Sequence, residues 1–356
     1  MPPVSTLAGV HAVLPPHQYA QDEITAEFAR VVLGVEAAEA SAAMVTRLHA
    51  NSRVDSRCLA LPLERYRELA GFDEANGLFI ERAVEFGAHA LTGALDRAAL
   101  APADVDAVFS TTITGIAVPS LEARIAAEVG LRPDVKRIPL FGLGCVAGAA
   151  GIARMHDYLV GHPDDAAALV SVELCSLTIQ RDDRSVANLV ATGLFGDGAA
   201  AVVATGSGRG ADGPRVLDSR SRLYPDSERT MGWDVGSGGL KIVLDANVPS
   251  LVERYLGDDV RGFLGDHGLT PGDVGAWVSH PGGPKVIEAI EAALGVEGDP
   301  LALTWSSLAR IGNLSSASVL HVLRDTLDQR PPERGTPGVL MAMGPGFCSE
   351  LVLLEW

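Results

Sequence analysis

Cysteine is scarce in this chain, with four residues (Cys58, Cys145, Cys175 and Cys348) among 356. No two of them form a CxxC pair, so we expect no metal site, and so few thiols in so long a chain are typical of reduced cytoplasmic proteins. The N-terminus lacks a basic region followed by an apolar block, which argues against a signal peptide. No charge-free apolar run is long enough to span a bilayer. These absences favour a folded cytoplasmic protein that does not enter a membrane.

Positive charge is also scarce. The chain has 28 Lys and Arg against 45 Asp and Glu, a formal net charge of −17. Such a surface disfavours nucleic acid and anionic membranes as partners. An anionic substrate is still possible, but it requires a local basic patch.

Helical and strand-like patterns alternate along the chain. Apolar residues recur with helical spacing in residues 22–34, 76–98 and 120–130. Short runs typical of buried strands occupy residues 105–112, 166–174, 199–205 and 338–344. The alternation predicts an α/β fold around a largely buried sheet.

Two pairs of segments repeat at nearly the same spacing. LAPADVDAVFSTT (100–112) matches LTPGDVGAWVSHP (269–281) with an offset of 169, and GCVAGAAGIARMHDYL (144–159) matches GNLSSASVLHVLRDTL (312–327) with an offset of 168. The near-equal offsets indicate two copies of one α/β unit. In this alignment Cys145 lies over Asn313, and we expect each to begin a helix that follows a buried strand.

If the copies pack about a pseudo-twofold axis, Cys145 and Asn313 meet near the centre, and His280 can join them from the end of a second-copy strand. A helix N-terminus and a nearby imidazolium both stabilise a thiolate, so we expect Cys145 to be largely ionised at neutral pH. Its backbone amide can donate to the oxyanion of an acyl-transfer intermediate.

Each of these residues also has a purely structural interpretation. Cys145 can be a buried thiol, His280 a core imidazole and Asn313 a helix N-cap. The glycines and prolines of VSHPGGPK (278–285) favour function, because they form a stiff turn that fixes the imidazole.

Four motifs together resemble the type III polyketide synthases, the chalcone synthase-like family. They are GCVAGAAG (144–151), HPGGP (280–284), GNLSSAS (312–318) and MGPGFCSELVLLEW (343–356). LFGDGAAAVV (194–203) matches a further family block, and MGWDVGSGG (231–239) resembles the bacterial alkylpyrone and alkylresorcinol synthases. The resemblance implies the thiolase fold, a five-layered α-β-α-β-α arrangement of duplicated halves, expected at residues 1–210 and 211–356.

The resemblance implies a catalytic triad of Cys145, His280 and Asn313, with Phe195 as an aromatic gatekeeper. Cys145 would attack the thioester of a starter acyl-CoA. Decarboxylation of malonyl-CoA would then give an enolate that His280 and the Asn313 amide stabilise. The apolar face of Phe195 would favour loss of the carboxylate as neutral carbon dioxide. No cofactor is expected, because the CoA thioesters are substrates.

The family blocks also imply residues that line the substrate cavity: Thr114, Val118, Cys175, Thr178, Trp233, Ile242 and Ser315. Plant relatives usually carry phenylalanine at the position of Ile242, so isoleucine there and the small Cys175 favour a long aliphatic starter. Each buried methylene stabilises by about 0.8 kcal/mol. Trp233 replaces a glycine of the plant enzymes, which argues against reuse of their cyclisation pocket. Val118 matches a residue that reaches the partner's cavity, so a homodimer is expected.

The CoA phosphates need positive charge on this acidic protein. Arg53 and Arg57, in NSRVDSRCLALP (51–62), lie in the region that resembles the family's basic CoA-binding stretch, and Lys285 directly follows HPGGP. Each of the three is an equally good candidate for a solvated surface residue.

These features favour a synthase of alkylpyrones or alkylresorcinols from fatty acyl-CoA and malonyl-CoA. The alternative within the family is a malonyl-primed tetrahydroxynaphthalene synthase. A ketoacyl-carrier-protein synthase shares the Cys, His and Asn, but HPGGP and GPGF fit the polyketide family better. A third hypothesis, an inactive homologue that serves as a binding partner, conflicts with the intact triad.

Overall fold

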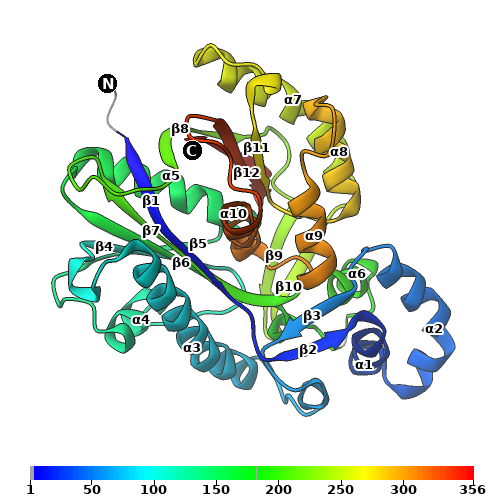
Figure 1. The fold of residues 1–356 in the computed structure, drawn as a ribbon. Coiled ribbons are helices and arrows are strands. Elements are labelled where there is room, and N and C mark those ends of the chain that lie inside the picture. The colour runs from blue at the N-terminus through cyan, green and yellow to red at the C-terminus, as the bar shows by residue number, and fades with distance from the viewer. Residues whose placement is uncertain (1–3, 182) are drawn as a thin grey trace.

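The computed structural model describes residues 4–181 and 183–356. Its centre is one mixed sheet of nine strands in the order β11-β12-β13-β8-β1-β7-β6-β4-β5 (Figure 1). In chain order these strands are β1 (Ser5–Val13), β4 (Ala107–Thr112), β5 (Lys136–Phe141), β6 (Ala166–Leu174), β7 (Asp197–Gly206), β8 (Arg215–Leu223), β11 (Ala276–Ser279), β12 (Pro337–Gly344) and β13 (Cys348–Glu355).

The sheet contains the same strand pattern twice. In the first half β4 pairs parallel with β6, which pairs antiparallel with β7, which pairs antiparallel with β1. In the second half β11, β12, β13 and β8 repeat this order and these directions. The halves join where β1 meets β8 at the pair Ser5↔Val216. This topology is what the internal sequence repeat predicts, with β5 as an added edge strand of the first half.

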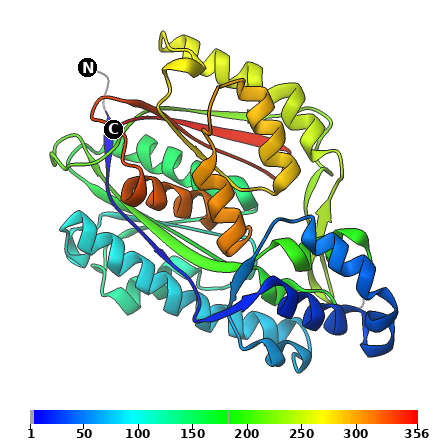
Figure 2. The same ribbon diagram turned by 45° about the vertical axis from the view of Figure 1, so that its right-hand side comes forward.

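Successive residues of the strands face different layers, as the period of a strand requires. In β6, Ala168 and Val170 pack with the outer helices, whereas Ala167 and Leu169 pack with the central helices. The outer helices of the first half are α3 (Phe72–Ala98) and α4 (Leu121–Val129). The central pair is α5 (Ala147–Gly161) and α10 (Ser318–Gln329), and α7 (Val248–Asp266) and α8 (Pro284–Leu294) cover the second half. Figure 2 shows α5 and α10 between the two halves of the sheet, so the five-layered thiolase-like fold is confirmed.

The remaining elements lie beside this core. They are the helices α1 (Gln21–Leu33), α2 (Val35–Ala50), α6 (Val186–Leu194) and α9 (Ala302–Ile311) and the two-stranded sheets β2 (His17–Ala20) with β3 (Ser56–Leu59) and β9 (Met231–Gly236) with β10 (Gly239–Leu244). No helix among the described residues has both the length and the apolar character that a bilayer crossing requires.

The predicted elements agree with the structure, but one predicted alignment is wrong. The predicted helices correspond to α1, α3 and α4, and the predicted strands to β4, β6, β7 and β12. In contrast, α5 begins at Ala147 and α10 at Ser318, 171 positions later, so Cys145 corresponds to Ser316 and not to Asn313. Asn313 lies in the loop after α9 and does not begin or cap α10, whose N-cap is Ala317. The strand before Cys145, β5, is a half-exposed edge strand and not a buried one.

The starts of the two central helices are in close contact. A methyl group at Gly148, in the first turn of α5, would lie 2.3 Å from the carbonyl oxygen of Ser316, next to the start of α10. At Gly161, the last residue of the same helix, a methyl group would meet nothing within 4 Å. Glycine at position 148 is therefore required by the helix contact.

We predict that Gly148→Ala destabilises the protein by about 1–3 kcal/mol, because the added methyl forces the two helix starts apart. The matched substitution Gly161→Ala should change stability by no more than about 1 kcal/mol. Urea unfolding followed by circular dichroism measures both effects. Equal midpoints for the two variants would contradict this account of the helix contact.

Candidate active site

Cys145 lies in a short 3₁₀ turn, Gly144–Val146, that leads into α5. Its side chain is buried, with 7% of the residue exposed, and its Sγ is 3.8 Å from Oγ of Ser315. Ser315 lies in the matching 3₁₀ turn before α10 and has a positive φ of 47°, in the left-handed region that non-glycine residues seldom adopt. The two turns meet at the centre, as the repeat predicted, although Ser315 and not Asn313 lies in the second turn.

His280 directly follows β11, and its backbone N–H donates to the carbonyl of Met341 at 3.0 Å. The chain then turns through Gly282 into α8, which begins at Pro284. Within the described part of the chain, neither ring nitrogen of His280 has a hydrogen-bond partner, although the residue is 5% exposed. Both nitrogens are therefore free to serve a ligand in the adjoining cavity.

Asn313 and Phe195 are joined by a short backbone bridge. The N–H of Asn313 donates to Leu194 at 2.9 Å, and the N–H of Gly196 donates to the carbonyl of Asn313 at 3.0 Å. The Asn313 side chain accepts from the N–H of Ser315 at 2.8 Å, and its Nδ2 donates to Gly282 at 3.4 Å. The long second bond leaves the amide N–H weakly held and available to another acceptor.

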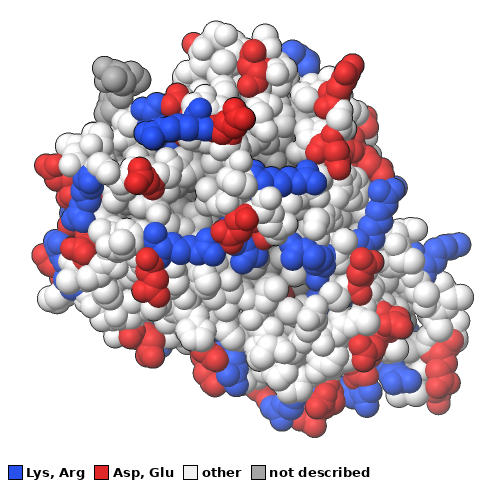
Figure 3. All heavy atoms as spheres, in the orientation of Figure 1, with Lys and Arg blue, Asp and Glu red and all other residues white. Residues whose placement is uncertain are grey.

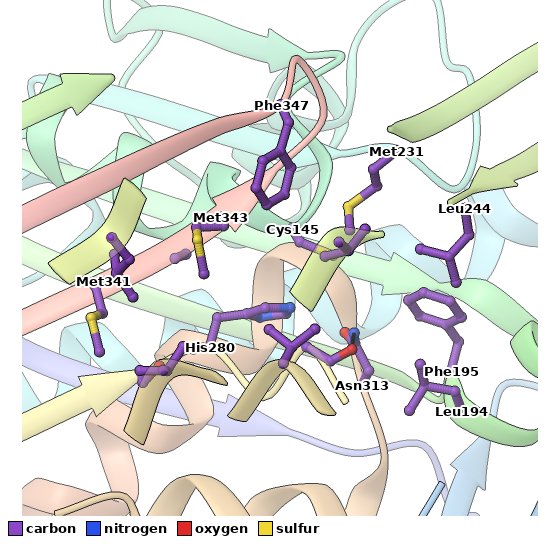
Figure 4. A pocket seen from close by; sticks show the side chains of 17 residues that line it. Cys145, Leu194, Phe195, Met231, Leu244, His280, Asn313, Met341, Met343 and Phe347 are labelled. Carbon is purple, nitrogen blue, oxygen red and sulfur yellow. Dashed lines mark hydrogen bonds between the residues drawn. The ribbon is translucent and has the colours of Figure 1, made fainter. Parts of the chain in front are cut away.

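These four residues line one cavity, here called the Cys145 pocket. Figure 4 shows Cys145 on one side, His280 and Asn313 opposite it, and the ring of Phe195 beside Leu244. The rest of the lining is almost entirely apolar: Leu194, Met231, Leu244, Val248, Leu256, Val286, Ile290, Met341, Ala342, Met343 and Phe347, with Ser279 and Gly282. A thiol, an imidazole and an amide thus share an enclosed apolar site.

Burial dominates the electrostatics of this pocket. It raises the pKa of the Cys145 thiol to about 12 and lowers the pKa of His280 to about 3, because each charged form loses its hydration. Hydrogen bonds from Ser315 and Asn313 favour the thiolate but are outweighed. Burial therefore favours a neutral thiol and a neutral imidazole and acts against the expected thiolate, which stays a prediction.

Of the predicted cavity residues, Ser315 lies next to Cys145, whereas the others do not line the Cys145 pocket. Cys175, Trp233 and Ile242 line a separate hollow, here called the rear hollow, on the far side of Phe195. Phe195 lines both spaces and forms the wall between them. Thr178 lies where the rear hollow adjoins a larger opening that Thr114 also lines.

Val118 lies on the surface, with 89% of the residue exposed. In this single chain it therefore does not reach the cavity. Its exposure is compatible with the predicted contact to a second subunit, which stays a prediction.

Of the predicted CoA-binding residues, Arg57 is misassigned. It is fully buried, and its guanidinium donates to the carbonyls of Phe195 at 2.5 Å and Thr192 at 2.8 Å, so it cannot meet a phosphate at the surface. Arg53 is exposed, pairs with Glu288 of α8 at 2.7 Å, and lies over the ring of Trp305. Lys285 is exposed in the first turn of the same helix.

The basic side chains are scattered over the face drawn in Figure 3. There the Lys and Arg side chains are interspersed with Asp and Glu and do not form one patch. Arg53 and Lys285 therefore remain candidates for CoA contacts on their local geometry alone.

Sequence reasoning missed Glu173. This fully buried carboxylate accepts hydrogen bonds from Ser316 Oγ at 2.5 Å, Thr114 Oγ1 at 2.9 Å and the N–H of Ile113 at 3.1 Å. It ties the turn before α10 to the strand β6, and burial raises its pKa. The only signal in the sequence was one acidic residue in the apolar run AAALVSVEL.

Met231, Leu244, Met341 and Met343 were also missed as walls of the Cys145 pocket. They lie in strand-like segments that read as ordinary core. Met231 and Leu244 face each other across the β9–β10 hairpin, two pairs along from the predicted pair Trp233 and Ile242. The hairpin thus presents one pair to each space, which residue types alone do not indicate.

We predict that alkylation of Cys145 by iodoacetamide accelerates about tenfold for each unit of pH between pH 7 and pH 9. The fraction of thiolate rises with pH throughout this range, because the folded pKa lies above it. The rate is taken as the difference between the protein and its Cys145→Ala variant, which removes the contribution of the other thiols. A rate that is constant from pH 6 to pH 8 would show a resting thiolate–imidazolium pair instead.

Comparison with known proteins agrees with this geometry. The model of the N-terminal domain of chalcone and stilbene synthases matches residues 4–208, and that of the C-terminal domain matches residues 216–355. The chain is 53% identical over 355 residues to a 1,3,6,8-tetrahydroxynaphthalene synthase of Streptomyces peucetius subsp. caesius, covering 99% of this chain and 93% of that protein. It is 38% identical to a putative chalcone synthase of Bacillus subtilis, covering 86% and 87% of the two chains.

A solved structure shows the same fold. The crystal structure of 1,3,6,8-tetrahydroxynaphthalene synthase from Streptomyces coelicolor A3(2), described as a bacterial type III polyketide synthase, superposes with a TM-score of 0.91 at 33% identity over 99% of both chains. With both family models and these relatives matched along its length, the chain belongs to the chalcone and stilbene synthase family and is an acyltransferase of the type III polyketide synthase class.

Proposed function

We propose that this enzyme uses malonyl-CoA both as starter and as extender and forms 1,3,6,8-tetrahydroxynaphthalene. The observation that carries the proposal is the 53% identity, over 99% of the chain, to a synthase of that name. The similarity favours this reaction over synthesis of an alkylpyrone or alkylresorcinol from a fatty acyl-CoA. The CoA thioester substrates are common to both reactions.

The rear hollow supports a short, polar starter. Besides Trp233 and Ile242, its lining includes the polar residues Ser176, Thr178 and Asn188. An alkyl chain that entered this space would lie against buried polar groups and would gain less than in an apolar tunnel. The bulk of Trp233 reduces the room for such a chain further, and both features suit an oxygenated polyketide better.

The first step in this proposal is acylation of Cys145. His280, held neutral by burial, accepts the thiol proton as Sγ attacks the thioester carbonyl of malonyl-CoA. A bond forms between Sγ and the acyl carbon, the bond from that carbon to the CoA sulfur breaks, and the CoA thiolate leaves with the proton from His280. The thiolate is a transient species of the cycle, which fits the pKa of the thiol being raised by burial.

Decarboxylation of an extender malonyl-CoA follows. The bond to the carboxylate breaks, carbon dioxide leaves, and the electron pair becomes an enolate whose oxygen accepts hydrogen bonds from His280 and the Asn313 amide. Phe195 presents an apolar wall beside these groups, which disfavours the charged carboxylate relative to neutral carbon dioxide. The enolate carbon then attacks the Cys145 thioester, and Cys145 is released as a thiolate to accept the lengthened chain again.

We predict that the purified enzyme, given malonyl-CoA alone, forms a tetrahydroxynaphthalene that carries no alkyl chain. Mass spectrometry of the products checks this, with a parallel incubation that also contains a long-chain acyl-CoA. The Cys145→Ala variant is the control and should form no product. Products that appear only with the added acyl-CoA and retain its alkyl chain would overturn the malonyl-primed reaction in favour of the fatty starter.

We also propose that the enzyme is a homodimer. Two exposed apolar side chains, Val118 and Phe141, support this, because 89% and 57% of these residues are accessible in the single chain. Phe141 ends β5, whose outer edge is unpaired within the described sheet and can pair with a second copy. Burial of these side chains would remove an exposed apolar surface from water.

We predict an elution volume and light-scattering mass of about twice the chain mass, because burial of apolar side chains drives association. Phe141→Lys should shift the protein toward the monomer. Val235→Lys, at a 71% exposed apolar residue of the β9–β10 hairpin, is the matched control and should leave the dimer intact. A monomeric unaltered protein, or equal effects of the two variants, would contradict an interface at β5.

A further inference from the structure

Arg57 has an environment that a surface role does not explain. It lies in β3, and its guanidinium donates to three neutral oxygens: Oε1 of Gln21 at 3.1 Å and the backbone carbonyls of Phe195 at 2.5 Å and Thr192 at 2.8 Å. Burial lowers its pKa to about 10, so it remains charged at neutral pH. A charge held this deep is costly unless its hydrogen bonds replace water.

The carbonyls that Arg57 holds belong to the end of α6, where Phe195 is the C-cap residue. The neighbouring carbonyls are also occupied, that of Gly193 by Gln21 Nε2 at 2.6 Å and that of Leu194 by the N–H of Asn313 at 2.9 Å. The C-terminal end of a helix is the negative end of its dipole and favours a cation. Arg57 thus supplies hydrogen-bond donors to the free carbonyls at the C-terminal end of α6, where Phe195 ends the helix.

Arg57 also packs close to the loop that carries Asn313. A methyl group at Gly312 would lie 3.0 Å from Cδ and 3.2 Å from Cγ of Arg57, and one at Gly196 would lie 3.6 Å from Cδ. The Arg57 stem therefore packs under Gly312 and Gly196, one residue before Asn313 and one after Phe195. A single side chain supports both sides of the bridge that joins these two active-site residues.

We propose that Arg57 is a positioning residue: its guanidinium and stem fix the Phe195–Asn313 bridge in the geometry that decarboxylation and condensation require. The inference deepens the proposed function, because it assigns no contact with substrate to Arg57 and rests on the roles given there to Phe195 and Asn313. Cys145 is carried by a separate turn before α5. Acylation of Cys145 should therefore depend little on Arg57, whereas the steps that use the enolate should depend on it strongly.

The test replaces Arg57 with methionine, which keeps a long stem but removes the donors, and with lysine, which keeps the charge but loses the planar fork. Two quantities are measured with malonyl-CoA: the acyl group on Cys145 after a rapid quench, and the rate of labelled carbon dioxide release. We expect Arg57→Met to lower carbon dioxide release about 10²-fold, as small misplacements of catalytic groups do. The amount of acylated Cys145 and the KM for malonyl-CoA should stay within about twofold. Arg57→Lys should recover about tenfold of the lost rate.

The control variant is Arg97→Met, which removes the exposed ion pair of Arg97 with Asp328 and should leave both quantities unchanged. A raised KM with unchanged turnover would overturn the proposal in favour of a CoA contact. Parallel loss of acylation and carbon dioxide release would reduce Arg57 to a general structural role. If Arg57→Met does not fold, Arg57→Lys decides by the same two readouts. The product that the unaltered enzyme forms tests the proposed function, whereas the Arg57 variants test the positioning role. The two proposals can therefore fail separately.

Discussion

The structure depends on one close contact, where the starts of α5 and α10 meet between the two halves of the sheet. The contact has no room for a side chain at Gly148, which faces the carbonyl of Ser316. It places the turn of Cys145 against the turn of Ser315, and Asn313 enters the same site just before that second turn. Helices that crossed farther apart would leave the thiol and the amide on separate surfaces. Duplication of one α/β unit brings the two turns together, because each copy contributes the same element to the centre.

Burial at this centre also sets the chemistry. An enclosed apolar pocket makes a permanent thiolate and imidazolium costly, so burial favours the neutral forms of the thiol and the imidazole. The same low polarity strengthens every hydrogen bond to an enolate that forms there. A site that keeps its charges transient is suited to a reaction whose negative charge appears and disappears at each extension. The N–H of a neutral His280, whose ring has no hydrogen-bond partner among the described residues, and the weakly held amide of Asn313 are the donors available for that charge.

The fold and the central residues could be predicted from the sequence, but the contacts of buried charged residues with distant segments could not. The repeat and the motifs around Cys145, His280 and Asn313 indicate one site, and the structure brings all three to it. The alignment of the copies failed by three positions, because the second copy has α9 where the first has the edge strand β5 and is slightly longer before its central helix. Arg57 was misread because an arginine in a short polar segment looks exposed, and nothing local shows that β3 passes beneath the end of α6. Glu173 was missed because its partners, Thr114 and Ser316, are distant in sequence.

Phe195 lies where the two halves of the chain and the two internal spaces meet. It ends a helix from the first half, pairs with a loop from the second, and separates the Cys145 pocket from the rear hollow. A displacement of its backbone would therefore change the decarboxylation site and the space for the growing chain at the same time. This coupling explains why so many donors converge on the last turn of α6 rather than on the ring itself: an aromatic ring offers no polar handle, so only its backbone can be held by hydrogen bonds. A rigid helix end therefore holds the apolar ring of Phe195 at a fixed position relative to the amide of Asn313.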